Sequence, residues 1–397
     1  MIFKIQPIST LSKSTTTTTT ISRAISSLKV KWRKDPKLDQ AIEKDKKHKL
    51  CARVLKEVLN EPGQVIPLLY LEKRRDRLRL NLRIKTFLSN NPSLFDTYLD
   101  RIKPPKSQLV PFLRPSQRLR HFLQREATIY ARNEALIVAK LCKLLMMAKH
   151  KVLSVDKLVH VKREFGFPND FLISLVPKYP NYFKISGAGQ QSFLELVEWN
   201  PDFARSVIET RALEETQLTG IRVRPNFNYR LPPGFVIKKE MREWARDWLE
   251  LDYVSPYEDV SHLDQSSREM EKRMVGVFHE LLSLSIYKRV PVPILGKFSD
   301  EYRFSNAFSS VFTRHSGIFY LSLKGGIKTA VLREAYKDDV LVDRDPLLEI
   351  RDRFDELLEE GWREREQQLR VQREQVKKDM EMMTMRAEHL DEHGVDD

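Results

Sequence analysis

The most constraining feature of this sequence is a pattern that occurs three times, over residues 51–95, 141–183 and 274–320. Each copy begins with an apolar helical stretch, followed by a turn signal, a basic segment and a further helix. In the first copy, one helix face carries apolar side chains at the spacing i, i+3, i+4, i+7, i+8, namely Cys51, Val54, Leu55, Val58 and Leu59. The repeated pattern predicts a largely helical chain.

Each copy closes with a helix breaker and a short strand. The predicted closing helices are 78–90, 169–178 and about 303–313, and the breakers are Asn91-Pro92, Tyr179-Pro180 and Ser316-Gly317. Soon after each breaker a phenylalanine opens an alternating run typical of a strand; these residues are Phe95, Phe183 and Phe319. We therefore predict a mainly α fold with short β-hairpins, built from three tandem winged-helix-like units at about residues 46–100, 126–190 and 268–335. The alternative is a helical bundle whose amphipathic helices resemble one another by chance.

The stretch FYLSLKGGIKTAVLREA (319–335) resembles a phosphate-binding loop at its centre. A Walker A loop has the form G-x-x-x-x-G-K-[ST], and no glycine directly precedes Lys328 here. Alternating runs lie on both sides of Gly325-Gly326, which predicts a β-hairpin closed by a tight two-residue turn. Lys324 and Lys328 would then lie near the tip of the third hairpin, where they could meet the phosphates of a nucleic acid.

The charge is unevenly distributed along the chain. The formal net charge is +14, but residues 35–332 alone carry +16, because residues 333–397 hold 12 Lys/Arg against 21 Asp/Glu. A basic body indicates a polyanionic partner, with a merely soluble basic protein as the alternative. The tail, 346–397, is predicted to be a charged helix that docks on the third unit through one apolar stripe, Leu347, Ile350, Phe354, Leu357 and Leu358.

Residues 1–34 have the composition of an organelle transit peptide, with 13 Ser/Thr, seven Lys/Arg and no acidic residue. On a helix, Ile21, Ile25 and Leu28 would share one face, which favours mitochondria. The long threonine run favours chloroplasts. We predict a mitochondrial protein, with a chloroplast protein as the alternative and a disordered cytosolic tail as a further one.

No residue pattern predicts catalysis. His279-Glu280 lacks the second histidine of H-E-x-x-H, so we expect a helical core or boundary histidine. His389 and His393 lie in a polar tail. Cys51 and Cys142 are expected to be buried thiols of a protein in a reducing compartment, and no apolar run is long enough for a membrane span. The predictions are no enzyme, no metal, no cofactor and no membrane insertion.

Three basic clusters mark the expected nucleic-acid contacts. The first lies in or just before the third helix of the first unit, the second follows a Pro-rich connector from Lys103 to Pro115, and the third interleaves with Phe227, Tyr229 and Phe235 and reaches Lys238 and Lys239. Arginine suits both phosphate contact and stacking, and aromatic rings suit base stacking. With the hairpin lysines, the predicted contacts are Arg74, Arg75, Arg77, Arg79, Arg83, Lys85, Arg114, Arg118, Arg120, Arg222, Arg224, Arg230, Lys324 and Lys328.

Several stretches carry a family resemblance. They are YVSPYED (253–259), EKRM (271–274), HELLSL (279–284), GIFYLSLK (317–324), LREAY (332–336) and DPL (345–347). In this combination the sequence resembles the plant organelle RNA recognition (PORR) domain family over about residues 33–355. The extension beyond about Gly361 is less typical of the family.

The resemblance implies a nuclear-encoded plant protein sent to mitochondria or chloroplasts. Proteins of this family bind organelle RNA and promote splicing of group II introns, so the expected partners are organelle intron RNA and other splicing factors in a ribonucleoprotein. The expected organisation is a transit peptide (1–34), an RNA-binding domain (35–345) and the charged tail (346–397). The alternative is a non-catalytic protein-docking subunit of an organelle ribonucleoprotein or ribosome-associated complex.

Overall fold

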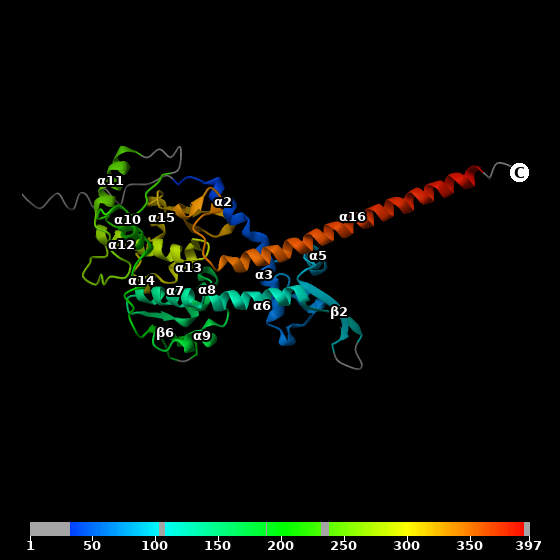
Figure 1. The fold of residues 1–397 in the computed structure, drawn as a ribbon, viewed down its shortest axis with the longest axis horizontal. Coiled ribbons are helices and arrows are strands. Elements are labelled where there is room, and N and C mark those ends of the chain that lie inside the picture. Colours follow the sequence, from blue (N-terminus) through cyan, green and yellow to red (C-terminus); the bar gives the residue numbers. More distant parts are fainter. Residues whose placement is uncertain (1–31, 103–107, 188, 232–237, 393–397) are drawn as a thin grey trace, which may run out of the picture.

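The computed structural model describes residues 32–102, 108–187, 189–231 and 238–392. Helices dominate, and the strands form three three-stranded sheets and one two-stranded pair, all antiparallel. Figure 1 shows a larger lobe on the left, a smaller one on the right, and the long helix α16 (Leu348–Glu392) projecting from the body. The predicted mainly α fold with short β-hairpins is confirmed.

Each copy of the sequence pattern folds into a unit with the same order of elements. Unit one (residues 45–115) contains α3 (Asp45–Leu59), β1 (Ile66–Pro67), α4 (Leu68–Lys73), α5 (Ile84–Asn90), β2 (Phe95–Arg101) and β3 (Leu109–Pro115). Unit two (134–196) contains α7 (Glu134–Met147), β4 (Val152–Ser154), α8 (Val155–Phe165), α9 (Phe171–Ser174), β5 (Phe183–Ser186) and β6 (Phe193–Leu196). Unit three (268–332) contains α12 (Arg268–Leu284), β7 (Arg289–Pro291), α13 (Val292–Gly296), α14 (Ser299–Tyr302), α15 (Ser309–Arg314), β8 (Phe319–Ser322) and β9 (Thr329–Leu332).

The three sheets also share one topology. Their strand orders are β1-β3-β2, β4-β6-β5 and β7-β9-β8, so the last strand always lies between the other two. The phenylalanine that opens each hairpin pairs with the last residue of the hairpin, in the registers Phe95↔Pro115, Phe183↔Leu196 and Phe319↔Leu332. The order helix, strand, helices, hairpin agrees with a winged helix-turn-helix, and that name stays a prediction.

The remaining elements connect or cover the units. They are α2 (Pro36–Glu43), α6 (Gln117–Arg132), α10 (Val207–Thr219), α11 (Lys239–Glu250), the strand pair β10 (Tyr336–Lys337) and β11 (Val340–Leu341), and α16. Side-chain caps start several helices. The hydroxyl of Ser116 accepts from the Leu119 N–H at 3.0 Å at the start of α6, and Ser206 and Glu209 form a capping box at the start of α10.

The closing helices are shorter than predicted. In unit one, α5 begins at Ile84 rather than at residue 78, and Arg79 lies in the left-handed region with φ 51°. In unit three, Arg303 has φ 58° and separates α14 from α15. In unit two, α9 ends at Ser174 and a 3₁₀ turn follows. In units one and three a left-handed residue, Arg79 or Arg303, lies at or near the start of the predicted helix, where a right-handed helix cannot continue. In unit two the α-helix gives way to the 3₁₀ turn Val176–Lys178, so periodicity alone overestimated all three lengths.

Two loop predictions are wrong. The stretch 109–115, expected to belong to a Pro-rich connector, is strand β3. Pro111 is tolerated there because the short β1 pairs only with Phe112 and Leu113, leaving one side of the strand open at Pro111. In unit three the hairpin is confirmed but its two-residue turn is not, since Ser322 pairs with Thr329 across six intervening residues.

The hydroxyl of Ser322 explains the longer turn. It accepts from the Lys324 N–H at 3.2 Å and donates to Asp39 at 2.6 Å, so it turns the chain before the glycines are reached. The glycine pair therefore lies within a loop rather than at a two-residue hairpin turn.

Units two and three share one hydrophobic core, whereas unit one has its own. The shared core joins residues such as Leu141, Leu145 and Leu194 of unit two to Phe278 and Phe319 of unit three. The core of unit one instead surrounds α3 and is completed by α6 and α16. Cys142 and Cys51 are buried in the two cores as free thiols, as predicted.

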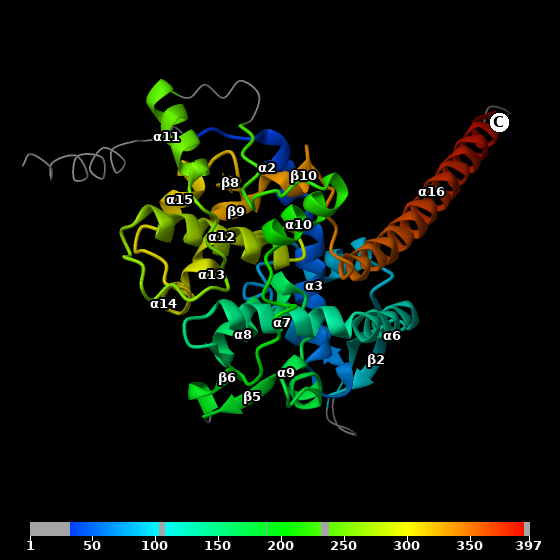
Figure 2. The ribbon, with the colours of Figure 1, turned by 60° about the vertical axis from the view of Figure 1, so that its left-hand side comes forward.

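The docking of α16 differs from the prediction. Phe354, Leu357 and Leu358 pack in the core of unit one. Leu347 lies in the core shared by units two and three, and the partly buried Ile350 packs against both cores. The partner surface is α6, because Phe122 lies 5.2 Å from Phe354, centroid to centroid. Helix α6 runs from unit one towards unit two, and the beginning of α16 passes beside it (Figure 2). The apolar side chains that α6 presents there include Leu119 and Phe122, which lie in the same core as Phe354.

The N-terminal segment covers the hairpin of unit three. The indole N–H of Trp32 donates to the carbonyl of Leu321 at 2.8 Å, and the buried carboxylate of Asp39 accepts from Tyr320 at 2.9 Å. Leu38 packs with Tyr320 in a small cluster of its own. Strand β8 is consequently buried on both faces.

Two glutamates of the larger lobe, the partly buried Glu334 and the fully buried Glu280, bind their neighbours. Glu334 accepts from His279 at 2.7 Å and from Arg211 at 2.7 and 3.0 Å. Burial alone would raise the pKa of Glu334, but the hydrogen bonds from His279 and Arg211 lower it to about 2. Glu280 accepts from Tyr257, Lys143 and the Val207 N–H at 2.8–3.0 Å. His279 is thus a helical core histidine, as predicted.

Candidate nucleic-acid interface

The first predicted cluster is partly neutralised by acidic residues within unit one. Arg74 binds Glu57 at 2.8 Å and also Glu61, while Arg77 binds Glu57 as well. Arg75 binds Glu72 at 3.2 Å. Glu57 lies in α3 and Glu61 in the turn after it, so Arg74 and Arg77 hold the α4 region against α3. Glu72 lies in α4 itself, so the pair of Arg75 is local.

The remaining cations of this cluster form no ion pair within the described part of the chain. Arg79, Arg83 and Lys85 are all exposed, on the turn before α5 and on its first residues. Their charges are therefore available to a phosphate. The cluster lies mostly before the third helix of unit one rather than in it.

The second cluster divides in the same way. Arg114 lies 3.9 Å from Asp96 and over the ring of Tyr98, and Arg118 binds Glu364 of α16 at 2.6 Å. Arg120 and the neighbouring Arg125, also on α6, are exposed and have no ion partner among the residues described. The acidic side of α16 therefore occupies one predicted RNA contact and leaves others free.

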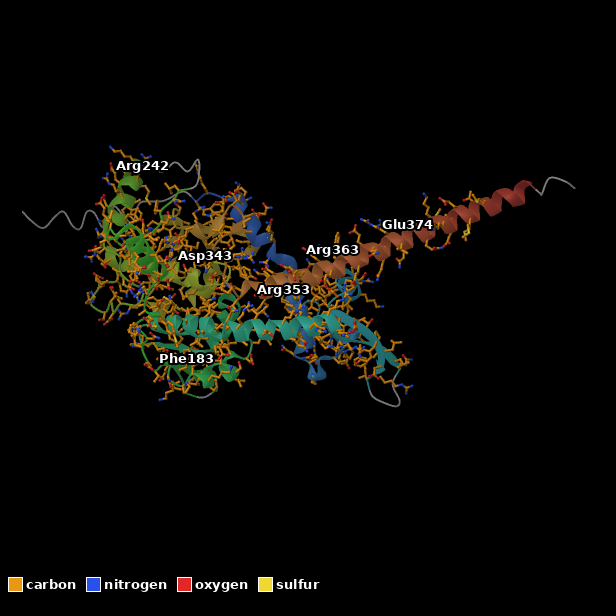
Figure 3. All side chains as sticks on the ribbon, in the orientation of Figure 1. Phe183, Arg242, Asp343, Arg353, Arg363 and Glu374 are labelled. Carbon is orange, nitrogen blue, oxygen red and sulfur yellow. The ribbon has the colours of Figure 1, made fainter. Side chains whose placement is uncertain are left out.

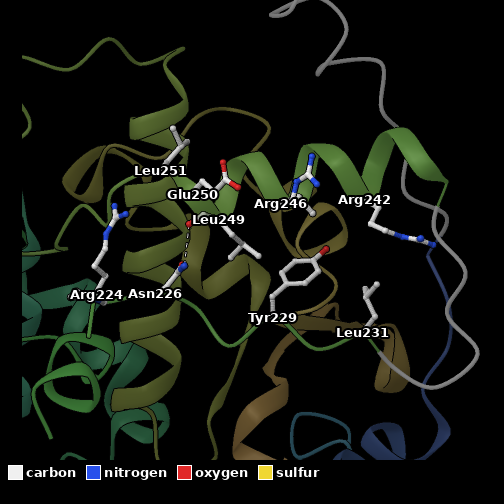
Figure 4. Close-up of a pocket in the computed structure, with 11 residues that line it drawn as sticks. Arg224, Asn226, Tyr229, Leu231, Arg242, Arg246, Leu249, Glu250 and Leu251 are labelled. Atoms are coloured by element: carbon white, nitrogen blue, oxygen red, sulfur yellow. Dashed lines mark hydrogen bonds between the residues drawn. The ribbon is translucent and has the colours of Figure 1, made fainter. Parts of the chain in front are cut away.

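Of the third cluster, Arg224 lines a groove of about 610 Å³ between residues 224–231 and helix α11. Figure 4 shows Tyr229 beneath α11, with Arg242 and Arg246 above it and Arg224 at the other end. The apolar part of the lining comes from Leu231, Ala245, Leu249 and Leu251. Arg230 is exposed on the segment that forms one wall of the groove, and Arg222 is exposed two residues before that segment begins.

Helix α11 is held in place by its buried face. Met241, Trp244 and Trp248 are buried, and Phe227 stacks on Trp248 at 5.4 Å. The ammonium of Lys272 donates to the carbonyls at the end of the helix, at 3.2 Å for Trp248 and 3.1 Å for the next residue. Burial lowers the pKa of Lys272 to about 8, so the group remains mostly charged at pH 7.

Sequence reasoning missed Arg242 and Arg246. The predicted cluster stopped at Lys238 and Lys239, whereas the helix continues and carries both arginines into the groove (Figure 4). The available signal was their spacing of four residues within an amphipathic helix, which places them on one face. Of the predicted aromatic residues, Tyr229 lines the groove, Phe227 is buried below it, and Phe235 lies outside the described residues.

The hairpin lysines of unit three occupy different surroundings. Lys324 binds Glu43 of α2 at 3.2 Å, while Lys328 is exposed and unpaired within the described structure. Helix α2 thus neutralises the charge of Lys324 and leaves that of Lys328 unpaired within the described residues.

No group of three or more His, Cys, Asp or Glu side chains within the described residues could hold a metal ion. His393 and the side chain of His389 lie outside that part of the chain. The helices described there include none that combines the length and apolar character of a membrane span.

Comparison with known proteins adds a family and several relatives. The family model of the plant organelle RNA recognition domain matches residues 33–363. WHAT'S THIS FACTOR 1, chloroplastic, from Zea mays is 36% identical over 335 residues, which cover 82% of this chain and 66% of the relative. ROOT PRIMORDIUM DEFECTIVE 1 from Arabidopsis thaliana is 30% identical, over 82% of both chains. WHAT'S THIS FACTOR 9, mitochondrial, from the same plant is 27% identical, over 87% of this chain and 89% of the relative.

The chain spans 62–66% of the length of the three WHAT'S THIS FACTOR 1 proteins it matches. No solved structure matches it.

Proposed function

The chain belongs to the plant organelle RNA recognition family, and from this premise we propose that it is an organellar RNA-binding protein that promotes splicing of group II introns. It would bind structured intron RNA and stabilise the folded form, while the RNA and its other partners carry out the chemistry. The observation that carries the proposal is the family match over residues 33–363. The family is described by RNA recognition rather than by a reaction, and we propose no enzymatic activity.

The free cations support this function. Arg79, Arg83 and Lys85 of unit one and Arg120 and Arg125 of α6 are exposed and have no ion pair among the described residues. Binding phosphates releases condensed counterions, so affinity should fall steeply with salt. The ion-paired Arg74, Arg75 and Arg77 remain predicted contacts of a weaker kind, because RNA must compete with their glutamates.

The test is a titration of residues 32–397 with a labelled group II intron fragment at two salt concentrations, with unstructured RNA and duplex DNA as competitors. We expect salt-sensitive binding that prefers the intron. Replacing Arg79, Arg83 and Lys85 by Ala should weaken binding and reduce the salt slope by about one per lost contact. The matched control replaces Arg370, Arg373 and Lys378 of α16 by Ala. Binding without intron preference would overturn the proposal.

For the compartment, we propose mitochondria on the composition of residues 1–34, with chloroplasts as the alternative. The relatives do not decide between the two organelles, because WHAT'S THIS FACTOR 1 is named chloroplastic and WHAT'S THIS FACTOR 9 is named mitochondrial. Because Trp32 binds the hairpin of unit three, we expect a leader to be cut before this residue. Import into isolated organelles of both kinds, with the mass of the processed product, tests both statements. A processed product that begins after Trp32 would contradict the expected cleavage position.

A second candidate function is that of a protein-docking subunit. The exposed apolar side chains of α16 beyond Gly361 favour it, among them Trp362, Val376 and Met383, which are 51%, 57% and 72% exposed. Apolar docking depends much less on salt than phosphate binding does. Intron binding that is weak and insensitive to salt would favour this function.

A further inference from the structure

We propose that the groove between residues 224–231 and α11 binds an unpaired nucleotide of the RNA, with its base on the apolar floor and its phosphate on Arg242 and Arg246. The inference rests on the proposed RNA-binding function and specifies the ligand of one site within it. The groove volume of about 610 Å³ lies within the usual range of small-ligand sites.

Helix α11 has three distinct faces. One face is buried and carries Met241, Trp244 and Trp248. At 100° per residue, the acidic side chains share a second face; they are Glu240, Glu243, Asp247 and Glu250, and of these only Glu250, at the end of the helix, also lines the groove. Arg242 and Arg246 lie on the third face with Ala245 and Leu249, and all four line the groove. The helix as a whole is nearly neutral, yet its charges are sorted so that the cations meet the groove.

The floor of the groove is suited to a base. Tyr229 lines it together with Leu231 and Leu249. The ring of Tyr229 is held from behind by Gly317, where a Cβ would approach within 2.7 Å of the ring atoms, and the Arg230 N–H donates to the Gly317 carbonyl at 3.0 Å. A ring fixed in this way offers a stacking surface at little cost in conformational entropy.

The arginines that line the groove can exchange their acidic neighbours for a phosphate. Arg242 has no ion pair among the described residues. Arg224 binds Asp252 and Arg246 lies 3.9 Å from Asp247, but these side chains are 53–91% exposed and such pairs are weak. Glu250 also lines the groove, where its carboxylate would repel a phosphate and accept a hydrogen bond from a 2′-hydroxyl or a base amino group.

Duplex RNA fits these features poorly. Its bases are stacked inside the helix, so a protein meets phosphates and a shallow minor groove. An apolar floor with an aromatic ring would remain empty against such a surface. A single-stranded loop or bulge offers a base that can enter the groove and a phosphate next to it. The geometry therefore favours an unpaired segment.

The test compares two labelled probes on residues 32–397: a single-stranded oligouridylate and a blunt RNA duplex of equal charge. The groove variant is Arg242→Glu with Arg246→Glu. The control, Arg373→Glu with Lys378→Glu on the projecting part of α16, has the same change in net charge. We expect the groove variant to lose about tenfold or more in affinity for the single strand, and no more than the control for the duplex.

A second variant, Tyr229→Leu, keeps an apolar floor but removes the ring. It should weaken single-strand binding several-fold, and near-ultraviolet circular dichroism checks that the fold persists. Equal losses for both probes in the groove variant, or no loss beyond the control, would overturn the inference. If the wild-type chain still prefers the intron fragment in that case, only the groove assignment fails; if it does not, the proposed function fails first.

Discussion

Unit one and unit three have the same order of elements and the same strand order, but different parts of the chain cover them. The core of unit three merges with that of unit two, and its hairpin is sealed by Trp32 and α2. Unit one keeps a separate core, which α6 and α16 complete from one side. Its hairpin is largely exposed, as Leu99 and Leu109 show at 66% and 59% exposure.

This difference shows that the repeated pattern determines the core of each unit. The segments between and beyond the repeats determine which surfaces of that unit are covered. In unit three the hairpin is a structural surface, and Lys324 is occupied by Glu43. In unit one the hairpin and the start of α5 remain open, with Arg79, Arg83 and Lys85 free. We therefore expect unit one and the groove at α11 to contact RNA more than the hairpin of unit three does.

The largest expected effect comes from destabilising one of the two hydrophobic cores at a time. Phe278 is fully buried in the shared core, 4.3 Å from Phe304 and 4.8 Å from Phe312, ring centroid to centroid. Phe87 of α5 is a similarly buried phenylalanine in the core of unit one. Each Phe→Ala change should cost about 3–5 kcal/mol of unfolding free energy in its own lobe. Hydrogen exchange read by mass spectrometry should show Phe278→Ala exposing units two and three only. Equal exposure of both lobes by either variant would show a single cooperative unit.

The next effect concerns Glu334, which ties α10 and α12 to the end of unit three. Its pKa of about 2 lies below the ordinary 4.5, so its contribution is present above pH 4.5 and is lost as the pH falls towards 2. Glu334→Gln should therefore lower the free energy of unfolding by on the order of 3 kcal/mol at pH 7, and by less at pH 3. Denaturant titrations at the two pH values measure this.

Glu374→Gln, on the projecting part of α16 (Figure 3), is the matched control and should change little at either pH. A loss for Glu334→Gln that is the same at both pH values would mean that the ionised carboxylate is not its source.

The smallest effect tests the contact between α16 and unit one. A Cβ at Gly361 would lie 2.5 Å from the Ser93 hydroxyl oxygen and 2.9 Å from its backbone nitrogen. Gly361→Ala should push α16 away from unit one and cost about 1–3 kcal/mol, even though alanine favours helices. Faster exchange at α5 and α6 would report the displacement, and Gln368→Ala, on the exposed part of α16, should cause none. Unchanged exchange at α5 and α6 would show that α16 is not held there.

Much of the fold was predictable because local rules decide it. The apolar periodicity located α3, α7 and α12, and the phenylalanine after each breaker located β2, β5 and β8. The helix lengths were less predictable, because one left-handed residue such as Arg303, which follows α14, prevents a continuous helix without altering the apolar periodicity. Among the site residues, Arg224 was predicted and lines the groove, but Arg242 was missed because it follows the basic cluster rather than belonging to it.

By itself, the sequence determined the three units, their basic character and their family, because hydrophobic spacing and residue composition act over short stretches of chain. Only the tertiary structure decided which charges remain free. Arg74 and Arg79 look equivalent in the sequence, yet one meets Glu57 and Glu61 and the other meets none of the described acidic groups. The docking of α16 on unit one was decided in the same way, since its apolar stripe suits any complementary surface and the path of α6 presents one at unit one. Pairing between distant segments depends on packing in three dimensions, which the order of residues along the chain does not display.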